Sequence, residues 1–241
     1  TPTPEIYTLS LHDALPICAT QVCRLATEED DAETGALPVG QRQPMALIVG
    51  RMSTEEGYKG HRELIDAWPA VLASVPEATL HIAGKGSALH ELQERARRSP
   101  AARQIVFHGF VDEGRLRGLY AQARLFAMPS RGEGFGLVYV DAMRCGLPVI
   151  ASCHDAGQEV VQDGVTGYCV DLDAPDDLPR RLIALLGSPD QAERMGRAGC
   201  ERWRTHSRFS GLRERFGKAR TGTEGTTGVE GGGAGGSGGR V

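Results

Sequence analysis

The sequence lacks three features that would assign it to common classes of protein. No run of eighteen apolar residues occurs, so no helix is predicted to span a membrane. The net charge of -4 and the pI of about 6.0 argue against nucleic acid as a partner. The six cysteines include no C-x-x-C pair, and Cys145 and Cys169 lie in apolar stretches. Reduced, mostly buried thiols in a cytoplasmic protein are therefore expected.

Both ends of the chain also lack the pattern of a folded domain. Residues 1–17 have neither the basic start nor the continuous apolar core of a signal peptide. Residues 5–17 resemble the translation of a widely used short-read sequencing adapter, so we expect residues 1–17 to be an artefact and the gene to be cut on its N-terminal side. Residues 18–44 are expected to form an irregular connector. Residues 221–241 are rich in glycine and are expected to be disordered.

Between these ends, residues 45–220 are predicted to form one α/β domain. Short apolar runs, expected to be strands, lie at 46–49, 79–83, 105–107, 125–128, 149–151 and 168–170. Helical patterns lie at 60–73, 89–97, 113–123, 135–144, 157–161, 176–186, 191–205 and 209–218. This alternation predicts βαβ units and a parallel sheet with helices on both faces, which binds ligands at the carboxyl ends of its strands.

The most informative motif follows the fourth expected strand and reads R-G-E-G-F-G-L-V-Y-V-D-A-M from Arg131. Gly134 and Gly136 let the backbone approach a ligand closely, and the amides at the start of the next helix face an anion. Glu133 lies in the loop, and Asp141, one turn into the helix, is expected to point back toward the same pocket. The alternative is a helix whose acidic first turn complements its dipole.

This motif, with the C-G-L-P-V-I-A that follows from Cys145, resembles the donor-sugar signature of retaining glycosyltransferase family 4. The resemblance extends from Met45 to Phe216 and implies a Rossmann-like domain, the C-terminal half of a GT-B glycosyltransferase, that needs no metal or other cofactor. It implies that Glu133 holds hydroxyls of the donor sugar and that Asp141, in place of the usual Glu, holds the ribose. The other donor contacts that it implies are made by Gly134, Phe135, Gly136, Leu137, Phe110 and Val111.

Two cations follow the first expected strand. Arg51 and Lys59 match the positions at which the family holds the donor diphosphate, so the resemblance makes them, with Glu133, the catalytic residues. A departing nucleoside diphosphate builds up negative charge that two fixed cations stabilise without a metal. The seven residues between them suggest a looped insertion that contains Glu55 and Glu56. The alternative for Lys59 is a solvated side chain at a helix start.

Three other motifs have simpler interpretations. The G-K-G-S segment at 84–87 lacks the rest of a phosphate-binding loop and is predicted to be a tight turn in which Ser87 caps the next helix. His108 is predicted to be a structural or rim residue. Asp171 and Asp173 imitate a metal-binding acid pair, but the helix that follows favours a role as helix caps.

The resemblance implies sugar transfer with retention from a nucleotide-diphosphate sugar to an unknown carbohydrate or lipid-linked acceptor. It places the protein in the cytoplasm or at the inner face of the membrane. The N-terminal domain that reads the acceptor is expected to be missing, so the chain is expected to bind donor weakly and transfer nothing. A non-catalytic nucleotide-sugar-binding module and a GT-B phosphorylase or nucleotide-sugar epimerase are the alternatives, because the fold alone does not decide function.

Overall fold

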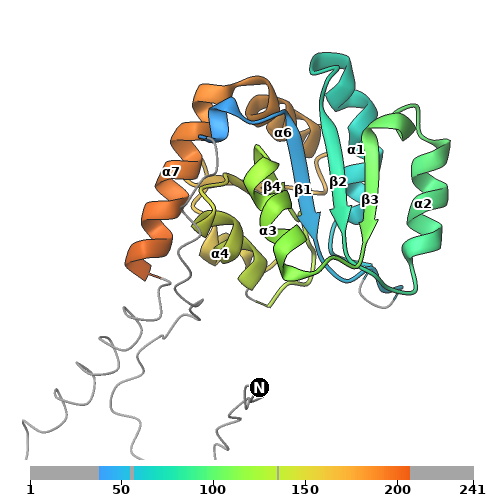
Figure 1. Ribbon diagram of the computed structural model, residues 1–241, viewed down its shortest axis with the longest axis horizontal. Helices are drawn as coiled ribbons and strands as arrows, with labels where there is room; N and C mark the ends of the chain where they lie inside the picture. The colour runs from blue at the N-terminus through green and yellow to red at the C-terminus, as the bar shows by residue number, and fades with distance from the viewer. Residues whose placement is uncertain (1–37, 55–56, 135, 207–241) are drawn as a thin grey trace, which may run out of the picture.

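A computed structural model describes residues 38–54, 57–134 and 136–206 (Figure 1). The predictions for residues 1–37, for the helix at 209–218 and for the glycine-rich tail fall outside these residues, as do Glu55, Glu56 and Phe135. No helix among the described residues combines the length and the apolar character needed to cross a membrane.

Strands and helices alternate as the sequence predicts. The strands are β1 (Met45–Val49), β2 (Thr79–Ala83), β3 (Ile105–Gly109), β4 (Leu125–Ala127), β5 (Val149–Ser152) and β6 (Gly167–Val170). The α-helices are α1 (His61–Ser74), α2 (Leu89–Arg98), α3 (Glu113–Gln122), α4 (Leu137–Arg144), α5 (Gly157–Val160), α6 (Asp177–Gly187) and α7 (Pro189–His206). Short 3-10 helices lie at η1 (Val39–Gln41) and η2 (Ala102–Gln104). Every described strand and α-helix begins and ends within two residues of its predicted bounds. The two 3-10 helices have no counterpart among the predicted elements.

The six strands form one parallel sheet in the order β3-β2-β1-β4-β5-β6. From β1 the chain moves outward to β3, and it then returns to β4, on the other side of β1. The strand order therefore reverses between β1 and β4. In open α/β sheets, the crevice outside the carboxyl ends of two such strands is where ligands bind.

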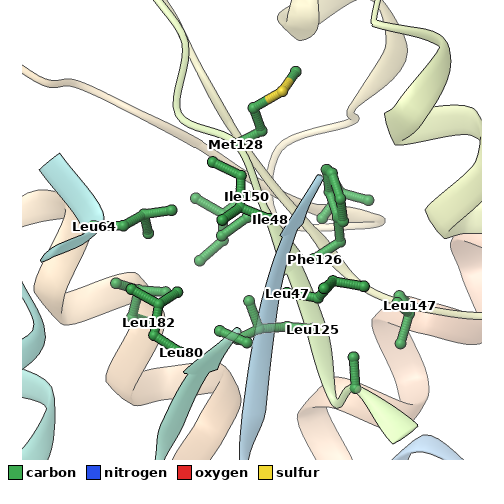
Figure 2. Close-up of a cluster of buried hydrophobic side chains, with 14 of the residues drawn as sticks. Leu47, Ile48, Leu64, Leu80, Leu125, Phe126, Met128, Leu147, Ile150 and Leu182 are labelled. Atoms are coloured by element: carbon green, nitrogen blue, oxygen red, sulfur yellow. The ribbon is translucent and has the colours of Figure 1, made fainter. Parts of the chain in front are cut away.

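Helices cover both faces of the sheet, as the sequence predicts. On one face α1 packs against α2 and α6, and on the other α4 packs against α5. Helix α7 lies at the edge and contacts both α4 and α6 (Figure 1). Because a parallel sheet is buried on both faces, its central strands are nearly continuous in apolar residues. Figure 2 shows this arrangement, with Leu64 of α1 and Leu182 of α6 on one side of β1 and Phe126 and Leu147 on the other. All four side chains are fully buried.

Helix α7 packs closely enough on the turn between α4 and β5 to require a glycine. A Cβ atom at Gly196 would lie well inside the van der Waals radius of the Gly146 carbonyl oxygen. The backbone of α7 thus touches the C-terminal end of α4, whose N-terminal end follows the predicted site loop. The position of α4 therefore depends on this contact.

We predict opposite effects for two Gly→Ala substitutions in helices. Gly196→Ala should lower the free energy of unfolding by about 1–3 kcal/mol, because the methyl group overpacks a backbone contact. Gly118→Ala in α3 is the matched control, since its Cβ would meet nothing nearer than the Gln122 side chain at 4.0 Å. It should stabilise the protein by about 0.5–1 kcal/mol through helix propensity. Urea unfolding of both variants tests this, and equal midpoints would contradict the close packing of α7.

Candidate functional site

The candidate site lies where the loops after β1 and β4 meet at the reversal of strand order. The first loop leaves β1 at Val49 and ends at α1, and the second leaves β4 at Ala127 and ends at α4. Arg51 and Lys59 belong to the first loop and Glu133 to the second. The fold thus brings the predicted cations and the predicted acid to the same edge of the sheet.

An ion pair joins the two loops. The Lys59 Nζ atom lies 3.1 Å from Glu133 Oε2, and the two side chains are only 16% and 19% exposed. Because both charges are largely removed from water, each depends on the other for compensation. Of the charged groups predicted for the site, these two are in direct contact.

Backbone and ring contacts hold the same two loops together. The Arg131 amide donates a hydrogen bond to the Tyr58 carbonyl oxygen at 2.9 Å. A Cβ atom on Gly132 would lie 3.1 Å from the Tyr58 ring, so the glycine allows this close stacking. The Lys59 ammonium lies 5.6 Å from the centre of the same ring. We did not predict a role for Tyr58 from the sequence, although an aromatic residue beside a predicted site lysine is a usable signal.

Asp155, in the loop after β5, fixes the backbone of Glu133. Its Oδ2 atom accepts the Glu133 amide at 2.9 Å, and its Oδ1 atom accepts the Gly157 amide at 2.8 Å. The Ala156 amide in turn donates to the Glu133 carbonyl oxygen at 3.3 Å. The sequence assigns no role to Asp155 at the site, because the Glu133 amide that it holds lies 22 positions away in the chain.

The two predicted loop glycines have different surroundings. Gly136 precedes α4 with φ of +79°, and a Cβ there would collide with the Tyr139 ring. The Tyr139 hydroxyl donates to the Met128 carbonyl oxygen at 2.7 Å, which joins α4 to the end of β4. A Cβ on Gly134, in contrast, would have no described atom within 4 Å. Its backbone is therefore open to approach, and the α4 helix begins at Leu137, two residues later than predicted.

Asp141 lies in the middle of α4, in different surroundings from Glu133. Burial raises the pKa of its carboxyl, and the nearby Arg144 guanidinium partly offsets this. Its charge also acts on the Tyr120 hydroxyl and on the Cys145 thiol, so these groups are its electrostatic neighbours. Among the described residues it makes no hydrogen bond or ion pair with Glu133. The predicted convergence of the two acids is not seen as a direct contact.

The G-K-G-S turn runs beside the loop after β1. The Met52 amide donates to the Lys85 carbonyl oxygen at 3.0 Å, and Gly84 and Gly86 leave no room for a Cβ beside that loop. The prediction that Ser87 caps α2 is wrong, because no side chain caps that helix. The Ser87 hydroxyl instead accepts the Thr54 amide at 3.1 Å. The Ser87 hydroxyl thus binds an amide of the loop after β1 and not an amide of the first turn of α2.

Phe110 and Val111 follow β3 at the rim of the same edge. The Phe110 ring is 73% exposed, and the Lys85 ammonium lies 5.0 Å from its centre. His108 Nε2 lies 3.0 Å from His81 Nδ1 of the neighbouring strand, a pairing that agrees with its structural interpretation. Burial, with the nearby His108, lowers the pKa of His81 to about 4.

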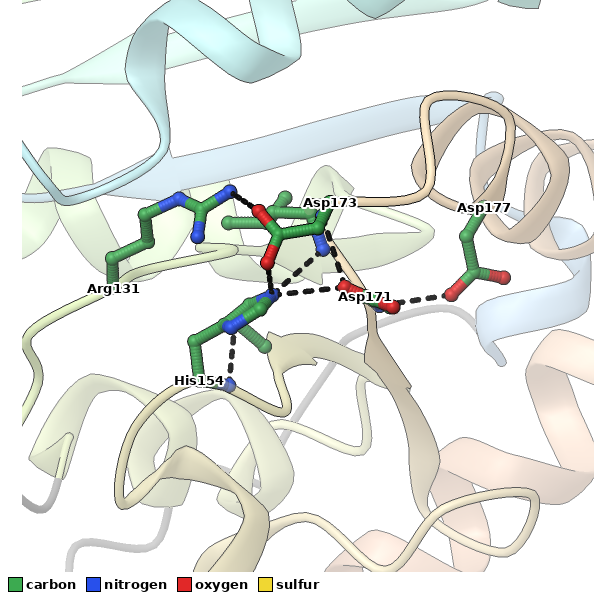
Figure 3. A network of polar contacts seen from close by, with 7 residues as sticks. Arg131, His154, Asp171, Asp173 and Asp177 are labelled. Atoms are coloured by element: carbon green, nitrogen blue, oxygen red, sulfur yellow. Dashed lines mark hydrogen bonds and ion pairs between the residues drawn. The ribbon is translucent and has the colours of Figure 1, made fainter.

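A polar network connects the Glu133 loop to the end of β6 (Figure 3). Arg131 Nη2 lies 2.7 Å from Asp173 Oδ1, and His154 Nε2 lies 3.0 Å from Asp171 Oδ1. The Leu172 amide donates to the same His154 nitrogen at 3.1 Å. Asp173, after β6, thus holds the Arg131 side chain, and Asp155, after β5, holds the Glu133 backbone.

The prediction that Asp171 and Asp173 cap a helix is wrong. Helix α6 begins after Asp176 without a side-chain cap, and the acids instead contact His154 and Arg131. The hydrogen bond runs in the opposite direction from a cap: the Asp177 carboxylate of α6 accepts the Asp171 amide at 2.9 Å. Cys153, His154 and Asp171 also present potential metal ligands within 4.8 Å of one another, although exposed acidic groups often cluster without a metal.

Comparison with known proteins gives consistent results. The family model for "Glycosyl transferases group 1" matches residues 43–188, more than half of the chain. A GDP-mannose-dependent alpha-(1-6)-phosphatidylinositol monomannoside mannosyltransferase of Mycolicibacterium smegmatis is 35% identical over 183 residues, which are 71% of this chain and 47% of that protein. The chain thus spans about half the length of the curated relatives that it matches.

Solved structures show the same fold. HepE from Anabaena, crystallised with UDP and glucose, is similar with a TM-score of 0.65 at 22% identity, over 76% of this chain and 49% of that one. The C-terminal domain of the group 1 glycosyl transferase LpcC from Francisella tularensis is similar with a TM-score of 0.62 at 23% identity, over 70% of this chain and 88% of that domain. At this identity the two structures support the fold alone. Together with the family match, they show that this chain belongs to the group 1 glycosyl transferases and has the fold of their C-terminal GT-B domain.

Proposed function

We propose that this chain is the donor-binding half of a glycosyltransferase that transfers a sugar, with retention, from a nucleotide-diphosphate sugar. The observation that carries the proposal is the sheltered Lys59–Glu133 pair at the reversal of strand order. A cation there suits a diphosphate, and a carboxylate beside it suits sugar hydroxyls. The M. smegmatis relative is named for GDP-mannose, so we take GDP-mannose as the first donor to test.

In this proposal, donor binding changes the partner of Lys59. Without donor, the Lys59 ammonium is held by Glu133 at 3.1 Å. The donor diphosphate carries more charge than one carboxylate, so it competes for Lys59 and leaves Glu133 to accept hydrogen bonds from the sugar. Because Asp155 holds the Glu133 backbone, the carboxylate is positioned before the sugar arrives.

The leaving group is stabilised by fixed positive charge. As the bond from the sugar to the nucleoside diphosphate breaks, negative charge grows on the phosphate oxygen, and Lys59 with Arg51 stabilises it. The first-turn amides of α4, at Leu137 and Val138, face the same edge of the sheet and add backbone donors. We therefore propose that the diphosphate is bound without a divalent metal.

The acceptor is proposed from the relatives. The M. smegmatis protein is named for a phosphatidylinositol monomannoside acceptor, a lipid with a sugar headgroup. A lipid-linked acceptor of this class would place the complete enzyme at a membrane surface, and we propose the cytoplasmic side. The four described cysteines are free thiols, which supports that placement, but the expectation that they are mostly buried is wrong, because only Cys200 is buried.

We predict that Lys59→Ala and Arg51→Ala each weaken GDP binding by about 10- to 150-fold, since each removes a charge-assisted contact to the diphosphate. Isothermal titration calorimetry on this chain measures the effect. Arg97→Ala, which removes an exposed cation of α2 that pairs with Glu94, is the control and should leave GDP binding unchanged. The double variant Lys59→Ala/Glu133→Gln should stay weak. Its recovery to normal affinity would show that an unpaired Glu133, and not loss of a phosphate contact, caused the defect.

We predict that the two acids affect different parts of the donor. Glu133→Gln should weaken binding of GDP-mannose but leave GDP binding unchanged or tighter, because the amide no longer competes for Lys59. Asp141→Asn should weaken both ligands, by about 1–3 kcal/mol, if a buried contact to the ribose is lost. Calorimetry with both ligands measures the difference.

Asp141→Glu is the control for this assignment, because it restores the residue usual in the family. It should bind GDP at least as well as the natural chain if the space around α4 accepts one more methylene. Should Asp141→Asn leave the affinity for GDP untouched, the ribose assignment is wrong, and Asp141 serves α4 alone.

We also predict that the affinity for GDP-mannose is the same in excess EDTA as with added manganese, because protein cations neutralise the diphosphate. Calorimetry in both buffers provides the test. Asp173→Asn is the control variant, and it should bind equally under both conditions. Binding that EDTA abolishes, manganese restores and Asp173→Asn removes would instead point to an acid-held metal.

A further inference from the structure

His61 is a buried polar residue to which neither the sequence analysis nor the proposed mechanism assigns a role. It is the first residue of α1, two positions after Lys59. Its side chain is only 4% exposed, yet its Nε2 atom has no hydrogen-bond partner among the described residues. A buried polar atom without a partner loses the hydrogen bonds that water would give it, so its place in the structure needs an explanation.

The imidazole is neutral at physiological pH. Burial, with the nearby Lys59 ammonium, lowers the pKa of His61 to about 4. A neutral imidazole carries one N–H donor and one acceptor. It can therefore form a directional hydrogen bond with an anion without adding a second positive charge beside Lys59.

The ring borders a small space at the end of β1. A Cβ atom on Gly50 would lie 3.4 Å from Lys59 Cδ, 3.7 Å from His61 Cε1 and 3.9 Å from Met128 Sδ. These are ordinary contact distances, so the space accepts about one methyl group. Cε1 is bonded to both ring nitrogens, which places Nε2 close to this space and to the Lys59 side chain. The space lies between the loops after β1 and β4, where ligands bind in such sheets.

The backbone at His61 is held in place. Gly60 precedes α1 with φ of +87°, and a Cβ there would lie 2.5 Å from the Pro129 carbonyl oxygen. The start of α1 is therefore fixed against the segment that follows β4. The amides of its first turn point toward the same region, with the positive end of the helix dipole. An anion in this space would meet His61, Lys59 and these amides together.

We propose that His61 is a further donor-site residue, whose Nε2–H donates a hydrogen bond to a phosphate oxygen of the nucleoside-diphosphate donor beside Lys59. This inference rests on the proposed function, because it needs the diphosphate to lie at Lys59. His61 thus supplies a neutral hydrogen-bond donor to the diphosphate, beside the two cations Arg51 and Lys59. This hydrogen bond also explains why a polar atom with no hydrogen-bond partner among the described residues lies in a buried position at the start of α1.

The test compares two His61 variants in GDP binding, by calorimetry on this chain. His61→Phe keeps a ring of similar size but removes the donor, and it should weaken GDP binding about tenfold. His61→Gln returns an N–H near the position of Nε2 and should recover most of the affinity. His90→Phe, an exposed histidine on α2, is the matched control and should bind GDP like the natural chain.

Unfolding and NMR give readouts that separate binding from packing. Without ligand, His61→Phe should be at least as stable in urea as the natural chain, because an unpaired polar group is replaced by an apolar one. The His61 imidazole signals should shift when GDP is added and stay in place when guanosine is added. A strongly destabilised His61→Phe, with no gain in affinity from Gln, would overturn the proposal in favour of a packing role.

The Lys59 variant separates failure of this inference from failure of the proposed function. If His61→Phe binds GDP normally while Lys59→Ala does not, the His61 proposal is wrong and the donor site stands. If both variants bind GDP normally, the diphosphate does not lie at Lys59, and both proposals are wrong. Gly50→Ala provides a second check, because its methyl group fits the unliganded protein and fills the space. It should keep the stability of the chain and weaken GDP binding, and normal binding would place the phosphate elsewhere.

Discussion

The ion pair between Lys59 and Glu133 is the interaction on which the arrangement of the site depends. It joins the loops after β1 and β4, two segments separated by 74 positions in the chain. Both charges are largely shielded from water, so separating the loops would leave two poorly compensated charges. The Arg131–Tyr58 backbone hydrogen bond strengthens the same junction. The site therefore exists only where the reversal of strand order brings these loops together.

The rest of the domain supports the Glu133 side of this pair. Asp155 holds the Glu133 backbone from the loop after β5, and Asp173 holds Arg131 from the loop after β6. Loops from three neighbouring strands thus contact the loop that carries Glu133. This is the rigid support that a catalytic or binding residue needs, because small displacements of a reacting group lower rates strongly. The loop needs glycines on both sides of Glu133. Gly132 packs against the Tyr58 ring, and Gly136 has a positive φ.

The Lys59 side of the pair has a different character. It is bordered by glycines and by the start of α1, and next to it lies the buried His61, whose Nε2 atom has no hydrogen-bond partner among the described residues. Side chains from two other loops hold the Glu133 side of the site, whereas the described residues leave the His61 Nε2 atom on the Lys59 side without a hydrogen-bond partner. An anion with several acceptor oxygens would complete the second side. This asymmetry agrees with a donor whose sugar lies toward Glu133 and whose diphosphate lies toward Lys59.

The sequence by itself determined the elements and the fold class, and it pointed to Lys59 and Glu133, which the structure brings together. Apolar runs, helical periods and glycine positions depend on each residue and its neighbours, so the described strands and α-helices begin and end within two residues of their predicted positions. The motif around Glu133 and the lysine after the first strand were likewise visible in the chain. Only the tertiary structure decided the partners of polar groups. Ser87 binds Thr54 and Asp171 binds His154, where local capping had been predicted. The burial of His61 also depends on segments distant in the chain, because a local pattern reports which face is apolar and not which group lies opposite.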